Sequence, residues 1–197
     1  MANENPNPNI PRVCLCSQGR SGSSMMMRVL RAGGLIVDVQ SDDFTSQKDL
    51  ELLRNPYGTF ESSATVFSGV FANSVKMLRP ELFTTIPKDY MIIFITRDIK
   101  GITASWNQVI GTGISQGRNM ATIDYVAHAI DRKSKWDSII ASNPNFLHLD
   151  YDTVCSNPQA MAQSVATYLQ TPQFPKFTFN QVAAALAVDT SLYINRK

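Results

Sequence analysis

The chain has 197 residues, of which 44% are hydrophobic and 17% are charged. This composition is typical of one folded domain with its own core, and it excludes a chain that is disordered along its length. The 18 basic and 16 acidic residues leave a formal net charge of +2, which does not favour a nucleic acid or a membrane surface as partner.

The N-terminal residues are polar and rich in Asn and Pro, and they lack the basic and apolar regions of a signal peptide. We therefore expect a flexible arm over residues 1–10 and a single domain over residues 11–197. No apolar run approaches the ~20 residues that a membrane helix requires. These features predict a soluble, cytoplasmic protein.

Strand and helix signals alternate along the chain. Residues 12–17 are apolar on both alternating faces, which is typical of a strand buried in a parallel sheet. Further strands are expected at 35–40, at 90–96, where the signal is strongest, and at 146–149. We expect a loop at 111–118 and helices over residues 25–32, 47–54, 63–75, 99–110, 120–141, 157–170 and 179–187.

This alternation predicts an α/β fold in which a parallel β-sheet is flanked by helices on both faces, a three-layer sandwich. Ligands of such sheets bind at the carboxyl ends of the strands. The chemistry is therefore expected in segments 17–24, 97–105 and 150–154.

Cysteine and histidine spacing gives no sign of a metal site. Cys14 and Cys16 alternate within an apolar run, and Cys155 leaves an odd total of three cysteines. The histidines, His128 and His148, show no ligand spacing. We therefore expect no metal and a reducing compartment.

The loop between the first strand and the first helix reads Ser-Gln-Gly-Arg-Ser-Gly-Ser-Ser over residues 17–24. Glycines such as Gly19 and Gly22 allow a tight turn close to an oxyanion, and the N–H groups at the start of a helix point at that anion. Further donors are the side chains of Arg20, Ser21, Ser23 and Ser24. The loop lacks the Gly-Lys-[Ser/Thr] ending of a Walker A motif. A turn in which Ser23 or Ser24 caps the next helix explains the same serines.

A second candidate element follows the strongest strand. Arg97 stands at the strand exit, and Ser105 lies on the apolar face of the following helix. An arginine and a hydroxyl placed in this way fit a second phosphate. The alternatives are an ion pair between Arg97 and Asp98, and a Ser105 hydroxyl bonded back to the carbonyl of Gly101.

Together these elements resemble the sulfotransferase family. Arg20-Ser21-Gly22-Ser23-Ser24 is similar to that family's loop for the 5′-phosphosulfate of 3′-phosphoadenosine 5′-phosphosulfate (PAPS). Arg97 and Ser105 have the spacing of the pair that holds the 3′-phosphate in the family. Residues 146–170 resemble the family's later strand, its Tyr-Glu-Asp-Leu turn and the helix after it. The resemblance covers residues 12–170 and implies a P-loop-type fold with PAPS bound at Gly19–Ser24, Arg97 and Ser105.

The chain also departs from the family pattern. Residues 75–80 keep a lysine, Lys76, where members acting on small phenols and steroids carry Lys-x-His, but they contain no histidine. Residues 55–61 instead resemble an Asn-Pro-x-Gly-x-[Phe/Trp]-Glu stretch of other small sulfotransferase-like proteins. This likeness implies Glu61 as the catalytic base, with Arg20 and Lys76 stabilising charge on the leaving phosphate. A solvated Glu61 and a surface Lys76 are the alternatives.

The implied reaction moves a sulfuryl group from PAPS to a hydroxyl or amine of a small-molecule, carbohydrate, lipid or peptide acceptor, without a metal. The product is 3′-phosphoadenosine 5′-phosphate (PAP). A PAPS- or PAP-binding module without a catalytic base is one alternative. A small-molecule kinase with a variant phosphate loop is another, although the loop lysine of such enzymes is missing.

Overall fold

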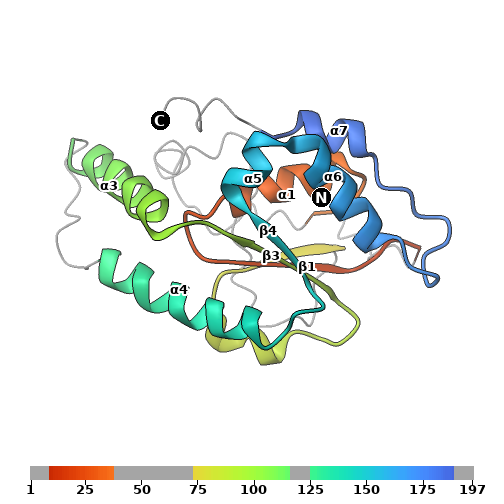
Figure 1. Ribbon diagram of the computed structural model, residues 1–197, viewed down its shortest axis with the longest axis horizontal. Helices are drawn as coiled ribbons and strands as arrows, with labels where there is room; N and C mark the ends of the chain where they lie inside the picture. The colour runs from red at the N-terminus through yellow and green to blue at the C-terminus, as the bar shows by residue number, and fades with distance from the viewer. Residues whose placement is uncertain (1–8, 38–72, 116–124, 189–197) are drawn as a thin grey trace, which may run out of the picture.

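A computed structural model describes residues 9–37, 73–115 and 125–188 (Figure 1). Four strands form an all-parallel sheet in the spatial order β2-β1-β3-β4. The strands are β1 (Val13–Ser17), β2 (Ser74–Met77), β3 (Met91–Thr96) and β4 (Leu147–Asp150). The strands predicted at 12–17, 90–96 and 146–149 are thereby confirmed. From the strand predicted at 35–40, Val37 pairs in parallel with Ser74, and residues 38–40 lie outside the described ranges.

Helices cover both faces of the sheet (Figure 1). One face carries α1 (Ser23–Ala32), α5 (Tyr151–Ser156), α6 (Pro158–Leu169) and α7 (Gln181–Leu186). The other face carries α4 (Tyr125–Ala141) and the 3₁₀ helix η1 (Pro80–Thr85), and α3 (Ile99–Ser115) packs beside α4. Within these described ranges, no helix is both long and apolar enough to cross a membrane.

The pleat of the buried strands divides their side chains between two cores. Val13 and Leu15 of β1 pack with α1, α5 and α6, whereas Cys14 and Cys16 pack with Phe94 and Trp136 on the opposite face. Because both faces are covered, every residue of β1 is buried. This burial explains why the strand reads as an unbroken apolar run.

Two predicted elements need correction, and one α-helix was not predicted. The helix predicted over 63–75 is wrong at its end, because Ser74 begins β2, a four-residue strand whose serine and lysine hide the apolar pattern. The loop predicted at 111–118 is wrong over 111–115, because α3 continues through Gly111 to Ser115. The helix predicted at 157–170 is confirmed as α6, but α5 precedes it and was not predicted. Residues 38–72, which include the helix predicted at 47–54, lie outside the described ranges.

The contact between α1 and the C-terminal part of the chain gives a stability prediction. A Cβ atom added at Gly33, the residue after α1, would lie 1.9 Å from Cε2 of the buried Phe179 ring. We expect Gly33→Ala to lower the free energy of unfolding in urea by about 1–3 kcal/mol, since the overpacked ring must move. Phe179→Leu should cost less stability in the Gly33→Ala protein than in the wild type. An equal loss of stability from Phe179→Leu in the wild type and in the Gly33→Ala protein would contradict the contact between Gly33 and the Phe179 ring.

Candidate functional site

The strand order places a topological switch point at the carboxyl ends of β1 and β3. From β1 the chain passes through α1 toward the β2 side of the sheet, and from β3 it passes through α3 and α4 toward β4. Two neighbouring parallel strands whose connections run in opposite directions form the position where α/β proteins bind ligands. The segments predicted to carry the chemistry, 17–24, 97–105 and 150–154, all lie at this edge of the sheet.

The loop after β1 leaves the start of α1 without a side-chain cap. Gly22 is the N-cap residue, with a left-handed φ of 93°, and as a glycine it provides no side-chain cap for the first turn. The first turn contains no acidic residue. Capping by Ser23 or Ser24, the structural alternative for these serines, is therefore excluded. The helix start is open to an anion because its N–H groups and dipole are not neutralised locally.

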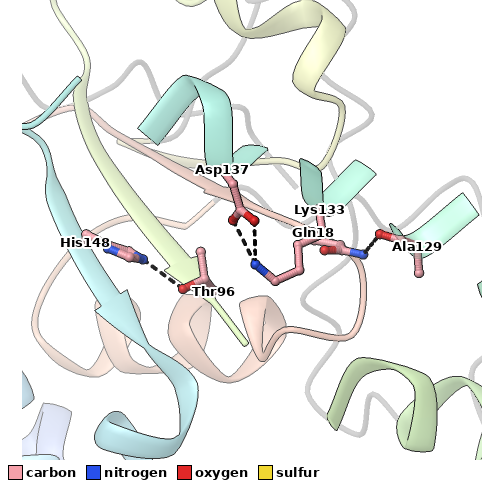
Figure 2. A network of polar contacts seen from close by, with 6 residues as sticks. All are labelled: Gln18, Thr96, Ala129, Lys133, Asp137 and His148. Carbon is pink, nitrogen blue, oxygen red and sulfur yellow. Dashed lines mark hydrogen bonds and ion pairs between the residues drawn. The ribbon is translucent and has the colours of Figure 1, made fainter. Parts of the chain in front are cut away.

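The loop itself is fixed by its own hydroxyls and amides. The Ser21 hydroxyl donates to the carbonyl of Gln18 at 2.6 Å and lies 3.3 Å from the carbonyl oxygen of Ile95 in β3. Gln18 in turn donates from Nε2 to the carbonyl of Ala129 in α4 (Figure 2). The loop is thus tied to both its neighbouring strand and the opposite helix layer.

Arg20 and Ser105, predicted to bind different parts of one nucleotide, are in direct contact. Arg20 Nε donates to Ser105 Oγ at 3.0 Å, and the guanidinium carbon lies 6.0 Å from the centroid of the Trp106 ring. Arg20 also adopts a left-handed φ of 73°, which is uncommon outside glycine. The bond from Ser105 back to the carbonyl of Gly101 is not among the contacts of this buried hydroxyl. Ser105 therefore orients the arginine of the first loop.

Arg97 is buried, with 8% of its surface exposed, and its Cζ lies 4.3 Å from the centroid of the Tyr151 ring. Its Nε atom is buried without a hydrogen-bond acceptor. No carboxylate of the described residues pairs with it, because Asp98 Oδ1 accepts the backbone N–H of Gly101 at 2.7 Å and caps the start of α3. The predicted alternative of an Arg97–Asp98 ion pair is therefore excluded.

Lys76 approaches the same loop from β2. It is 2% exposed, and its Nζ lies 3.5 Å from the Oγ of Ser24 in the first turn of α1. The alternative of a surface lysine is thereby wrong. Glu61, the predicted base, lies outside the described residues.

A cavity of about 10 Å³ lies between the ends of β1 and β3 and helix α4, large enough for one water molecule at most. Its lining includes Thr96, Lys133 and Asp137, all drawn in Figure 2. Thr96 Oγ1 lies 2.8 Å from Nε2 of His148, and Lys133 pairs with Asp137 at 2.6 Å. The first contact joins β3 to β4, and the second is an ion pair within α4.

Cys16, which also lines the cavity, does not provide a nucleophile. Burial, reinforced by a hydrogen bond with Cys14, raises the pKa of the Cys16 thiol well above its usual value. Both cysteines are fully buried. The thiol therefore stays protonated and acts as a small core residue.

The predicted site residues thus meet in two pairs, Arg20 with Ser105 and Lys76 with Ser24. Arg97 instead contacts Tyr151, a residue to which the sequence analysis gave no role. The likeness of residues 146–170 to the Tyr-Glu-Asp-Leu turn pointed to its position, although not to its contact with an arginine. Gln18 carried no signal, because its partner is a backbone carbonyl more than 100 residues away.

Comparison of the chain with models of protein families and with curated proteins gave no match.

Two glycines of α3 provide a matched test of how tightly Arg97 is held. A Cβ atom at Gly101 would lie 2.4 Å from Arg97 Nε and 2.6 Å from Asp98 Oδ1, whereas one at Gly111 would meet nothing within 4 Å. Gly111→Ala should raise the free energy of unfolding by about 0.5–1 kcal/mol through helix propensity. Gly101→Ala should be less stable than Gly111→Ala by about 1–2 kcal/mol, because it displaces the cap and the arginine. If urea unfolding showed that Gly101→Ala and Gly111→Ala raise the free energy of unfolding equally, the tight packing of Arg97 would be contradicted.

Proposed function

We propose that the protein is a sulfotransferase with a P-loop-type fold that transfers the sulfuryl group of PAPS to a hydroxyl or amine of an acceptor. The observation that carries the proposal is the buried Arg97, whose Nε has no acceptor, at the strand exit next to the uncapped start of α1. The motif likeness of residues 17–24 and 97–105 adds support. The acceptor classes are small molecules, carbohydrates, lipids and peptides.

A nucleotide with two separate phosphate groups fits these residues. Burying a guanidinium without a counter-charge is unfavourable, so Arg97 is satisfied best by an anion. The first turn of α1 has no side-chain cap, and residues 19–24 lead into it. The backbone N–H groups of this segment offer a second group of donors for an anion. The hydroxyl of Ser17 at the end of β1, buried without a partner in the part of the chain that the structure describes, adds a third polar atom that a ligand would satisfy.

Two side chains, Arg20 and Lys76, supply positive charge for the chemistry. When bound, PAPS supplies an activated sulfuryl group whose leaving group is a phosphate oxygen. Arg20, held by Ser105, and Lys76, held beside Ser24, neutralise negative charge at the loop. Glu61 takes the proton of the acceptor in this proposal. The arginines and the lysine make a metal ion unnecessary for charge stabilisation.

Two other functions use the same donors. A module that binds PAP without turnover would need Arg97 and the loop but not Glu61. A small-molecule kinase would bind ATP with Mg²⁺ instead of PAP, and the loop lacks the lysine that such enzymes use.

Calorimetric titration with PAP, and with ATP plus Mg²⁺ for comparison, separates these functions. We expect saturable binding of PAP that weakens about 10- to 100-fold in Arg97→Ala, since charge-assisted hydrogen bonds to a phosphate are lost. Arg31→Ala is the matched control, because this exposed arginine in the last turn of α1 carries the same charge away from the site. Binding of ATP with Mg²⁺ but not PAP would overturn the proposal.

Turnover separates an enzyme from a binding module. With water as acceptor, release of sulfate from PAPS in a single turnover should slow about 10²–10³-fold in Lys76→Met, because charge stabilisation at the leaving oxygen is lost. PAP affinity should fall by only about tenfold or less. Lys100→Met, at an exposed lysine of α3, should leave both quantities unchanged. A Lys76→Met protein with wild-type sulfate release would exclude the catalytic role of Lys76.

A further inference from the structure

Tyr151 lies where the exit of a third strand meets the candidate site. It is the first residue of α5, directly after β4, and Asp150 caps this helix by accepting the backbone N–H of Thr153 at 2.9 Å (Figure 1). The cap fixes the start of α5 and with it the place of the tyrosine. The side chain is 6% exposed and belongs to the core beneath α1.

The Tyr151 ring contacts both halves of the site. The guanidinium carbon of Arg97 lies 4.3 Å from the ring centroid, within the range of a cation–π interaction. The same ring packs so closely on Gly22 that a Cβ atom there would lie 2.3 Å from Cδ2 of the tyrosine. The ring therefore contacts both Arg97 and the turn at the start of α1.

We propose that Tyr151 is a positioning residue that sets the spacing between Arg97 and the first loop, so that the site selects a nucleotide carrying both a 3′- and a 5′-phosphate. This inference rests on the proposed function. The ring acts through Arg97 and Gly22 and is not itself a ligand of the nucleotide. Its aromatic face and width matter for this role, and its hydroxyl does not.

The arginine needs such a support because the structure gives it little else. Asp98 is engaged with the backbone of Gly101, and Gly101 leaves space for the arginine side chain without bonding to it. A flexible side chain without a fixed partner loses conformational entropy when a phosphate orders it. A guanidinium already held against a ring loses less conformational entropy on binding, so the ring favours ligands whose phosphate reaches the guanidinium.

The test compares the affinities of PAP and AMP, which lacks the 3′-phosphate, by calorimetry. In Tyr151→Leu we expect the ratio of PAP to AMP affinity to fall about tenfold, while Tyr151→Phe keeps the wild-type ratio because it retains the ring. Tyr168→Leu is the matched control. This tyrosine of α6 accepts the backbone N–H of Ile92 at the start of β3, away from the site, so its loss should lower stability without changing the ratio.

A second measurement needs no nucleotide. In urea unfolding, the stability losses of Tyr151→Leu and Arg97→Ala should be non-additive in the double variant, because the two side chains are in contact, whereas those of Tyr168→Leu and Arg97→Ala should add. An unchanged affinity ratio in Tyr151→Leu, or additive losses with Arg97→Ala, would overturn the positioning role. A wild-type protein that binds neither nucleotide would instead overturn the proposed function. The non-additivity of the unfolding free energies would still show whether Tyr151 and Arg97 interact.

Discussion

The buried guanidinium of Arg97 is the constraint on which the rest of the site depends. A charge in that position, stacked on Tyr151 with its Nε lacking an acceptor, is unfavourable until an anion reaches it. Gly101 leaves room for the side chain, and Asp98 caps α3 instead of neutralising the arginine. Among the described residues, the local sequence therefore leaves this positive charge without a carboxylate partner at the carboxyl edge of the sheet, where ligands of such folds bind.

The opposite edge of the sheet offers an internal comparison. Arg12 precedes β1 and lies over the ring of Tyr90 at 4.4 Å, much as Arg97 lies over Tyr151. Arg12, however, has a carboxylate partner, with NH1 2.8 Å from Asp89 Oδ2, and NH2 donates to the Tyr90 hydroxyl at 2.7 Å. Burial raises the pKa of that phenol, and Arg12 opposes the rise. Among the described residues, the Nε atoms of both arginines are buried without an acceptor, but only Arg12 has a carboxylate partner. That partner is the arrangement expected of a structural residue.

Much of this architecture could be predicted from the sequence because it depends on local patterns. The apolar runs of β1 and β3 gave the strands, and the alternation with helices gave the parallel sheet and the edge that carries the loops. Strand β2 was missed because Ser74 and Lys76 face the α1 side of a four-residue strand and break its apolar pattern. The Arg20–Ser105 and Arg97–Tyr151 contacts join residues 85 and 54 positions apart, and spacing alone contains no information on such pairs. Motif likeness identified the arginines, whereas the packing of the sheet decided their partners.

In the proposed function, the exits of β1 and β3 bind the two phosphate groups of one nucleotide. A crystal structure of the protein with PAP would show where each phosphate lies. We predict the 3′-phosphate within hydrogen-bonding distance of Arg97 Nε, about 2.7–3.0 Å, and the 5′-phosphate on the backbone N–H groups at the start of α1. PAP bound elsewhere, or bound at the α1 start with Arg97 still lacking an acceptor, would contradict it.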